Sequence, residues 1–217
     1  VSYHYKGRYL LDFNYRRDAS SRYSKNSQWG SFPAVSAGWI VSDENFFEPV
    51  KNVVSFLKIR GSYGITGVDP GSYYSQYQSL INTANYYNSR LGLNYGDITT
   101  YNGSVVTYPN YNGTAADRNI TWEQSPQANL GFELGLLNDR LNITTDLYVR
   151  DSKRKIFDVA VPVTSGYTLR QDNFVSLRNS GIEVAIAANV FSPKSAFQWR
   201  INANVAYNQN YVTKLPD

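Results

Sequence analysis

Residues 129–150 read NLGFELGLLNDRLNITTDLYVR, and this stretch decides the fold. Two runs of alternating apolar and polar residues flank the turn-forming triplet Leu137, Asn138 and Asp139. Successive side chains of a β-strand point to opposite faces, so each run predicts a strand with one apolar and one polar face. Two such strands joined by so short a link predict a tight antiparallel hairpin.

The same period of two recurs along the rest of the chain. The apolar members of the other predicted strands are Tyr9, Leu11, Phe13 and Tyr15; Val35, Ala37, Trp39 and Val41; Leu57, Ile59, Tyr63 and Ile65; Ile182, Val184, Ile186 and Val190; and Phe197, Trp199, Ile201, Val205 and Tyr207. About eight strands, the first of them truncated, account for the pattern, and no stretch has the period of an amphipathic helix. The sequence therefore predicts an all-β chain.

The links between the predicted strands alternate in length. Short links at 6–8, 137–139 and 191–196 alternate with longer ones at 17–31, 67–120 and 151–178, and the link 42–54 is intermediate. An antiparallel up-and-down sheet with long links at one end and mostly short links at the other is typical of outer-membrane β-barrels. We therefore expect a transmembrane barrel segment with two long extracellular loops, about 67–120 and about 151–178.

The composition argues against several classes of function. The 21 Lys and Arg against 17 Asp and Glu give a net charge of +4, and no run of five like charges suggests a nucleic-acid partner. The chain has no cysteine and one histidine, His4, which removes thiolate chemistry and clustered histidine ligands. We predict no catalytic residues, no metal site and no cofactor. No stretch approaches the roughly 18 apolar residues of a transmembrane helix.

Charged residues recur on the polar faces of the predicted strands. They are Arg60, Glu133, Asp146, Glu183 and Arg200. Such charges would be costly in a closed apolar core unless they were paired, but they suit the water-filled or protein-filled lumen of a barrel. We therefore expect these five side chains to face the lumen, and the apolar faces, with tyrosine and tryptophan near their ends, to face lipid.

The alternation alone leaves one alternative open. A period of two does not say which face meets water, so a soluble, non-catalytic, carbohydrate-binding β-sandwich or barrel fits the same pattern. The two differ in what covers the apolar face: lipid in the membrane barrel, and a second sheet in the soluble module.

The insertion 67–120 is rich in tyrosine, asparagine and glycine. Its candidate substrate-binding residues are Tyr73, Tyr74, Tyr77, Tyr86, Tyr87 and Tyr101. Tyrosine rings bordered by amides can stack on sugar rings and hydrogen-bond to hydroxyls. The same tyrosines could instead pack the loop onto its neighbours, and the sequence leaves both interpretations open.

Several stretches carry a family resemblance when they are taken in order and spacing. They are YKGRYLL at 5–11, RRDASSRY at 16–23, WGSFPAVSAGW at 29–39, LKIRGSYGITG at 57–67, the pair Trp122 and Glu123, and NSGIE at 179–183. Together they resemble the barrel of the SusC/RagA family of TonB-dependent outer-membrane transporters. The resemblance covers most of the chain except about 70–117.

The resemblance implies a fold and a function beyond what the residue pattern gives. It implies that residues 1–217 form part of one 22-stranded barrel domain whose plug domain is absent from this chain. It further implies TonB-dependent uptake of glycan oligosaccharides or peptides with a SusD-like surface lipoprotein, in the outer membrane of a Gram-negative, Bacteroidetes-like bacterium. The shared motifs are architectural, so they assign no substrate contact to a residue.

Overall fold

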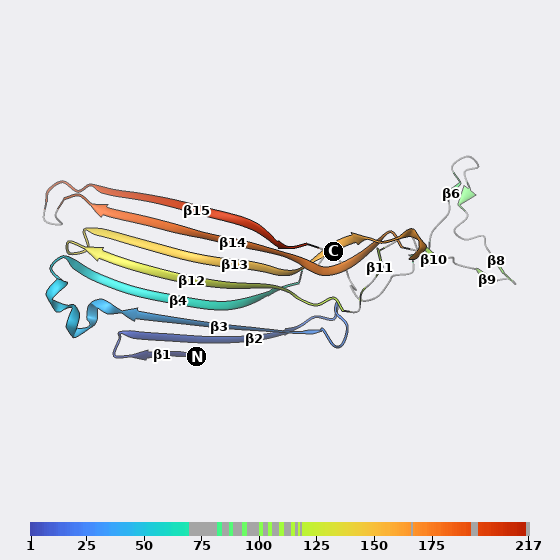
Figure 1. Ribbon diagram of the computed structural model, residues 1–217, viewed down its shortest axis with the longest axis horizontal. Coiled ribbons are helices and arrows are strands. Elements are labelled where there is room, and N and C mark those ends of the chain that lie inside the picture. The colour runs from blue at the N-terminus through green and yellow to red at the C-terminus, as the bar shows by residue number, and fades with distance from the viewer. Residues whose placement is uncertain are drawn as a thin grey trace.

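The computed structural model describes residues 1–69, 119–165, 167–191 and 195–215, together with Asp117 and several two-residue strands between 82 and 115. Eight antiparallel strands lie in one sheet in the order β1-β2-β3-β4-β12-β13-β14-β15, and a short ninth strand, β11 (Thr114–Ala115), pairs in parallel with β14 (Figure 1). Their bounds are β1 (Ser2–Tyr5), β2 (Tyr9–Ala19), β3 (Trp29–Ile40), β4 (Val54–Val68), β12 (Glu123–Leu136), β13 (Leu141–Ala160), β14 (Leu169–Asn189) and β15 (Arg200–Lys214).

The remaining elements are short. Two 3₁₀ helices, η1 (Val41–Asp43) and η2 (Asn45–Val50), lie between β3 and β4, and η4 (Val163–Ser165) lies between β13 and β14. The two-residue strands are β5 (Asn82–Thr83), β6 (Tyr87–Asn88), β7 (Leu93–Asn94), β8 (Thr100–Tyr101), β9 (Ser104–Val105), β10 (Pro109–Asn110) and β11 (Thr114–Ala115). No helix among the described residues is long and apolar enough to cross a membrane.

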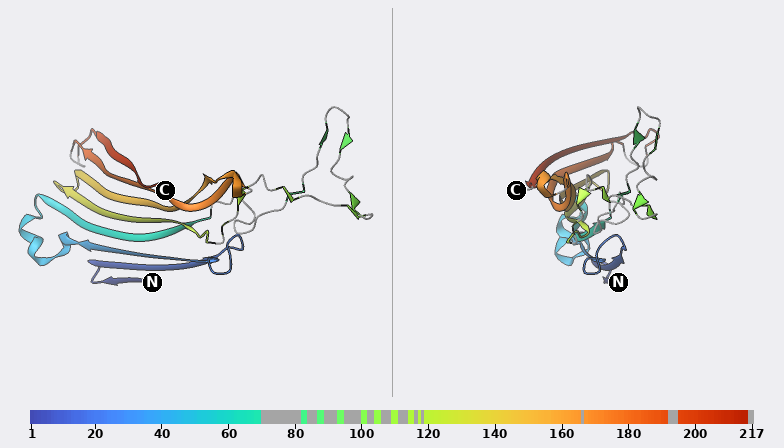
Figure 2. Two further views of the ribbon diagram at one scale, coloured as in Figure 1. Left: turned by 45° about the vertical axis from the view of Figure 1, so that its right-hand side comes forward. Right: turned by 90° about the vertical axis from the view of Figure 1, so that its right-hand side faces the viewer.

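The sheet is a bowed, open wall, as the two views of Figure 2 show. Consecutive long strands are neighbours throughout, which is the up-and-down order that the sequence predicts. The soluble sandwich requires a second sheet over the apolar face, whereas all eight of these strands belong to a single sheet. The prediction of an all-β chain of about eight antiparallel strands is confirmed.

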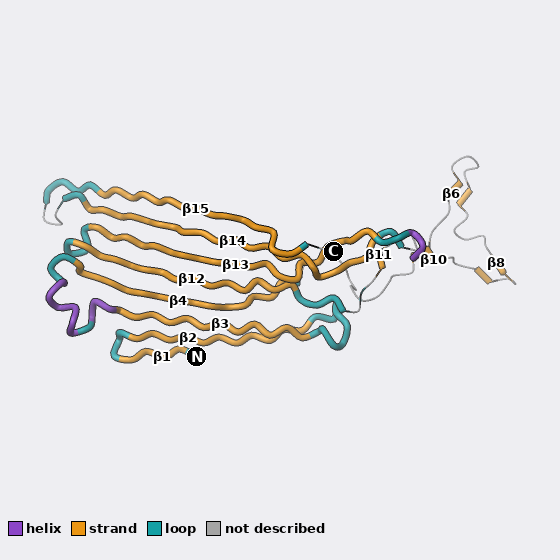
Figure 3. The backbone as a smooth tube through the Cα atoms, in the orientation of Figure 1, coloured by secondary structure: helices purple, strands orange, loops and turns teal. Residues whose placement is uncertain are grey.

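The connections divide the molecule into two ends. At the short-turn end lie the links 6–8, 41–53 and 137–140 and the described residues of 190–199, and at the long-loop end lie the links 20–28 and 161–168, together with Asp69 and residues 119–122 (Figure 3). The turn after β12 is built from three consecutive residues with positive φ: Leu137 (55°), Asn138 (56°) and Asp139 (60°). Asn and Asp tolerate this left-handed conformation better than most residues, which explains why the chain reverses there.

The predicted long loop at 151–178 is wrong in its extent. β13 continues to Ala160 and β14 begins at Leu169, so only residues 161–168 connect the two strands. The register shifts between Ser152 and Lys155 and again between Lys155 and Phe157, and Arg154 has a positive φ of 57°. These bulges interrupt the period of two, and the polar run from Ser152 to Lys155 therefore resembles a loop in the sequence.

A buried aromatic cluster closes the long-loop end of the sheet. Tyr23, Phe32, Ile120 and Trp122 pack together, each at most 7% exposed. The Trp122 ring lies edge-on to Phe32, with 5.6 Å between ring centroids, and its indole N–H donates to the Gln28 carbonyl (3.0 Å). Burial raises the pKa of the Tyr23 hydroxyl. The cluster thus joins the β2–β3 link to the residues that lead into β12.

Gly67 makes room for this cluster, and its replacement tests the packing. A Cβ added at Gly67 would overlap Cζ of Phe32, whereas one added at Gly61, on the same strand, would meet only the Asn129 carbonyl oxygen at 3.9 Å. We expect Gly67→Ala to lower the free energy of unfolding by about 1–3 kcal/mol through overpacking. Gly61→Ala, the matched control, is expected to change it little. Thermal melting of the detergent-purified protein that contains this chain measures both, and equal melting midpoints would contradict the packing described.

Candidate functional site

The polar face of the sheet carries one continuous row of residues across six strands. The register aligns Gly38 of β3, Arg60 of β4, Gly131 of β12, Asp146 of β13, Glu183 of β14 and Ala206 of β15. Because residues two apart on a strand share a face, Glu133 and Arg200 lie on this face as well. The register therefore places all five predicted charged residues on one face of the sheet.

Arg60 is the centre of an ion network on this face. Its Nη2 donates to both carboxylate oxygens of Asp146 (2.7 and 2.8 Å), and its Nε donates to Glu133 (3.1 Å). Its Nη1 donates to the Asn129 side chain (3.3 Å), and Lys58 donates to the same Glu133 oxygen at 3.4 Å. The planar guanidinium can serve three neighbours at once, which a lysine could not do with the same geometry.

Gly131 lies between Arg60 and Asp146 in the row and lets the two side chains meet. A Cβ added at Gly131 would lie 2.6 Å from Cζ of Arg60. The Arg60 side chain thus crosses β12 at Gly131 to reach Asp146 on β13. It passes through the space that the side chain of a larger residue at position 131 would occupy. The glycine in this strand is explained by a close approach rather than by an unusual backbone angle.

Glu183 and Arg200 are not part of the ion network. Glu183 lies opposite Asp146 and Ala206, and Arg200 lies opposite Asn189 at the short-turn end. Neither forms a salt bridge within the described part of the chain. The structure thus brings three of the five predicted residues together and leaves two as separate charges on the same face.

The β14–β15 part of the polar face is rich in amides, which lie beside the two charges Glu183 and Arg200. Asn202, Asn204, Asn208 and Asn210 project from one face of β15, opposite Ala187, Ala185, Gly181 and Asn179 of β14. Tyr148 of β13 lies against Gly181, where an added Cβ would be 2.8 Å from the tyrosine hydroxyl. Among the described residues, hollows open on this same face, and one of about 500 Å³ is lined by Gln127, Asn129, Tyr148, Arg150, Asn179 and Glu183 among others.

Sequence reasoning missed several residues of this face. Lys58, Tyr148 and Arg150 each occupy a polar-face position in the alternating pattern, and the asparagine repeat of β15 is visible in the sequence. Alternation alone does not single these residues out as site candidates. What distinguishes them is the register of neighbouring strands, because it decides that Lys58 meets Glu133 and that Tyr148 lies beside Gly181.

Four of the six tyrosine candidates, Tyr73, Tyr74, Tyr77 and Tyr86, lie outside the described residues. Tyr87 and Tyr101 are placed only as backbone positions in β6 and β8. Their proposed contact with substrate therefore stays a prediction. The start of the insertion is described: Asp69, directly after β4, accepts a hydrogen bond from the Ser20 hydroxyl (2.9 Å) and pairs with Arg22 (3.1 Å).

The last part of the insertion is also fastened at the long-loop end. Asn173 of β14 accepts a hydrogen bond from the Thr121 amide (2.8 Å) and donates to the Thr121 carbonyl (3.0 Å). The same side-chain amide donates to the Arg154 carbonyl (2.7 Å), and β11 pairs in parallel with Leu169 and Arg170 of β14. One asparagine therefore joins the insertion to both strands of the β13–β14 hairpin.

The whole chain, residues 1–217, matches the family described as TonB dependent receptor-like, beta-barrel. Among curated relatives, TonB-dependent receptor P39 of Formosa agariphila is 34% identical over 100% of this chain and 19% of its own length. TonB-dependent receptor SusC of Bacteroides thetaiotaomicron is 34% identical over 99% of this chain and 20% of its own length. The chain thus spans about a fifth of the curated relatives it matches, and both are named as receptors rather than enzymes.

Solved structures give the same result for the fold. The RagAB peptide importer in its open-open state superposes with a TM-score of 0.80 and 27% identity, over 99% of this chain and 21% of that one. The siderophore receptor PirA from Pseudomonas aeruginosa superposes with a TM-score of 0.59 over 98% of this chain and 33% of that one, and at 14% identity that likeness concerns the fold alone. The barrel resemblance drawn from the sequence is confirmed.

The Arg60 network predicts a measurable coupling between two strands that are not neighbours. A double-mutant cycle of Arg60→Gln and Asp146→Asn should give an interaction energy of about 0.5–3 kcal/mol, because the two side chains bond directly. The control cycle pairs Arg60→Gln with Asp151→Asn, whose carboxylate bonds Arg178 instead (2.7 Å), and should be additive. Urea unfolding of the complete protein in phospholipid vesicles measures both cycles. Additivity of the Arg60 and Asp146 changes would contradict the network.

Proposed function

The chain belongs to the TonB-dependent receptor β-barrel family, and on this basis we propose that it forms part of the wall of an outer-membrane nutrient importer of the SusC/RagA type. The observation that carries the proposal is the separation of the two faces of the sheet. One face carries the ion network and the amide row, and the other carries exposed apolar and aromatic side chains.

The apolar face exposes large hydrophobic side chains from every strand of the sheet. Those between 38% and 70% exposed include Tyr3, Tyr5, Tyr9, Leu11, Phe13, Tyr15, Trp29, Val35, Tyr63, Leu130, Leu147, Val149, Ile182, Ile186, Ile201, Val205, Tyr207 and Tyr211. An uncovered apolar surface of this extent fits contact with lipid hydrocarbon, and strands of about 9–11 residues are long enough to cross it. We assign this face to the lipid and the polar face to the barrel interior.

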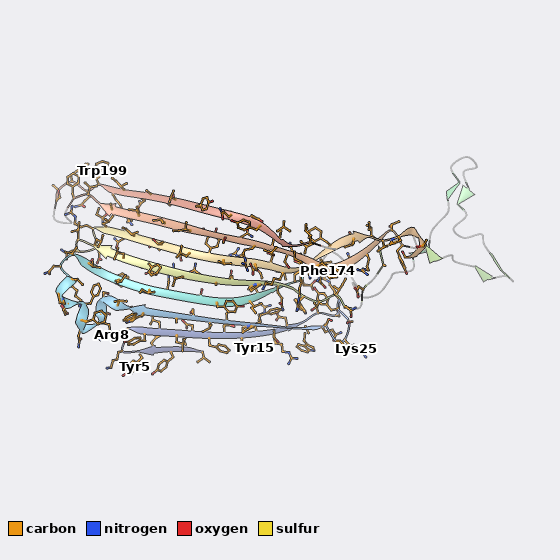
Figure 4. All side chains as sticks on the ribbon, viewed as in Figure 1. Tyr5, Arg8, Tyr15, Lys25, Phe174 and Trp199 are labelled. Carbon is orange, nitrogen blue, oxygen red and sulfur yellow. The ribbon has the colours of Figure 1, made fainter. Side chains whose placement is uncertain are left out.

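Aromatic side chains near the ends of the apolar face support the membrane orientation. Tyr9 stacks on Trp39 at the short-turn end, with centroids 6.4 Å apart and planes within 7°. Toward the long-loop end, Arg17 lies over the Trp29 ring at 4.7 Å from its centroid. Figure 4 shows Tyr5 and Trp199 at the short-turn end and Lys25 and Phe174 toward the opposite end. We assign the short-turn end to the periplasm and the long-loop end to the cell exterior.

The polar face would then meet the plug and the substrate path. Arg60, Glu133 and Asp146 neutralise one another, which leaves Glu183, Arg200 and the β15 amides available to hydrated or protein partners. We propose that residues 1–217 belong to one 22-stranded barrel domain, with the plug and the site of TonB contact elsewhere in the protein. The cargo is a glycan oligosaccharide or a peptide, received with a SusD-like surface lipoprotein.

We propose that the protein lies in the outer membrane of a Gram-negative, Bacteroidetes-like bacterium, because the relatives come from Bacteroides and Formosa. In that setting 67–120 is an extracellular loop. Tyr73, Tyr74, Tyr77, Tyr86, Tyr87 and Tyr101 are its proposed substrate contacts. The β13–β14 hairpin, with its connection at 161–168, extends on the same outer side.

A charge on the lipid-facing side of the sheet tests the assignment of faces. Ile143 pairs with Ile186, and Val184 pairs with Thr145, all on the apolar face. Ile143→Arg and Val184→Arg should each impair assembly by about 2–4 kcal/mol if the site lies near mid-bilayer. Thr144→Arg and Ala185→Arg place the same charge one residue away on the polar face and should assemble normally. The heat-dependent gel shift of the complete protein from outer membranes measures assembly. Equal gel shifts for all four variants would contradict the assignment of the two faces.

The tyrosines of the insertion predict an effect on uptake that leaves assembly unchanged. Replacing all six by alanine should lower uptake of the labelled cargo by about tenfold or more, since each stacked ring contributes on the order of 0.5–1.5 kcal/mol. Labelled oligosaccharide and labelled peptide mixtures, each supplied with and without a protonophore, identify the cargo class and its energy source. Wild-type rates in the six-alanine variant would show that these rings do not hold the cargo.

A further inference from the structure

The link between β3 and β4 presents three apolar side chains at the short-turn end. Residues 41–53 contain η1 and η2, and within them Phe46 is 65% exposed, Val53 is 60% exposed and Val50 is 46% exposed. A link in water normally exposes polar residues, so three neighbouring exposed hydrophobic residues indicate a contact with something apolar. We call residues 41–53 the β3–β4 link.

The link continues the apolar face without a break. The Phe46 ring lies 6.4 Å from the Trp39 ring, and the Trp39 ring stacks on Tyr9. Tyr5 follows at 6.2 Å from Tyr9. Phe46 is therefore the last ring of a row of aromatic side chains that begins on β1 and runs along the end of the apolar face.

Glu44 holds the link in this position. Its carboxylate accepts hydrogen bonds from the Tyr9 hydroxyl (2.7 Å), the Trp39 indole N–H (3.2 Å) and Arg8 Nη1 (3.0 Å). These bonds hold the pKa of Glu44 below its usual range, with the Tyr9 bond as the largest cause. One carboxylate thus satisfies the polar ends of two rings whose apolar parts face outward.

The link is also attached to the sheet by its other side. Val41 and Phe47 are 6% and 7% exposed, so they anchor the inner side of the link. The Leu137 amide donates to the Val53 carbonyl (3.0 Å), which joins the end of the link to the neighbouring β12–β13 turn. Phe46 and Val53 are therefore exposed on a fixed support, and their exposure is a property of the folded surface.

The charges of the link suit a surface between lipid and water. Lys51 pairs with Glu48 at 3.0 Å and Arg8 pairs with Glu44 at 3.0 Å, so these charges offset each other, and Asp43 is a further, exposed carboxylate of the link. On the neighbouring β1–β2 turn, Lys6 lies over the Tyr5 ring at 5.3 Å from its centroid. Exposed aromatic and apolar side chains beside balanced or cationic groups are typical of segments that lie in the headgroup region of a bilayer.

A second aromatic group lies at the same end of the sheet, on the β14–β15 connection. Phe191 and Phe197 pack edge to face with centroids 5.4 Å apart, and Trp199 is 54% exposed. This group comes from a different connection, which adjoins the opposite edge of the sheet from β1. Two separate connections at the short-turn end thus carry exposed rings, which is expected if that end lies at a lipid surface.

We propose that the β3–β4 link is an interfacial membrane segment: Phe46, Val50 and Val53 contact phospholipid at the periplasmic surface of the bilayer, and Glu44 fixes the link there. The proposal rests on the proposed function, because it requires the apolar face to lie in lipid. Continuity with that face favours lipid over a protein partner as the occupant of this surface.

The experiment places one spin label at a time on the complete protein in phospholipid vesicles. The chain has no cysteine, so single cysteines can be introduced into a complete protein made free of others. Phe46→Cys and Val53→Cys report the link, Phe13→Cys reports the apolar face, and Glu48→Cys is the matched control on the same helix as Phe46. Collision rates with oxygen, which enriches in lipid, and with a water-soluble nickel complex measure the surroundings of each label.

The expected result is a graded series. The Phe13 label should collide mainly with oxygen, the Phe46 and Val53 labels should have oxygen-to-nickel ratios several-fold above that of the Glu48 label, and the Glu48 label should behave as if in water. Adding Glu44→Gln should move the Phe46 label toward the value of the Glu48 label while leaving the Phe13 label unchanged.

Three outcomes overturn the inference, and they are distinguishable from one another. If the Phe46 and Val53 labels are as accessible to nickel as the Glu48 label while the Phe13 label stays in lipid, the link lies in water and the barrel proposal stands. If both link labels are shielded from oxygen and nickel alike, a protein covers the link, and the barrel proposal again stands. If the Phe13 label itself is in water, the outer-membrane proposal fails, and the inference fails with it.

Discussion

A strand that crosses a membrane must pair its backbone N–H and C=O groups within the protein and must also keep its apolar side chains on one face. The register of the ladder meets both demands in this chain. β12 pairs with β4 from Val68 opposite Glu123 to Leu57 opposite Leu134 without a shift, and with β13 from Gln127 to Leu136. A slip of one residue would turn Lys58 and Arg60 onto the apolar face and bring Ile59 to the polar face, so every feature of either face depends on this register.

The faces were predictable from the sequence, but the neighbours across strands were not. A period of two assigns Arg60, Glu133 and Asp146 to a polar face, because alternation is a property of each strand alone. That Arg60 reaches Asp146 across Gly131 depends on how three strands align, and no single strand contains that information. The error at 151–178 has a related cause: bulges and a left-handed φ at Arg154 remove the alternation while the strand pairing continues.

The two halves of the polar face satisfy their polar groups in different ways. On β4, β12 and β13 the charges are satisfied by each other, and these side chains are only 22% to 35% exposed. On β14 and β15 asparagine amides outnumber the two charges, Glu183 and Arg200, and the small residues Ala185 and Ala187 lie opposite Asn204 and Asn202. The first half is a self-contained ionic surface, whereas the second can exchange hydrogen bonds with water or a passing solute. The polar face of this sheet is therefore chemically asymmetric.

The β13–β14 hairpin has a mechanical consequence. β13 and β14 have 20 and 21 residues, so about ten residues of each project some 30 Å past the roughly ten that a bilayer needs. The bulges near Ser152 and Lys155 lie at the base of this projection. A small rotation of the hairpin about this base would displace its tip by a larger distance than its base. Because β11 is paired near the tip and Asn173 holds Thr121 near the base, such a rotation would carry the end of the insertion with it. The hairpin and the described end of the insertion are therefore joined at two points along the projection.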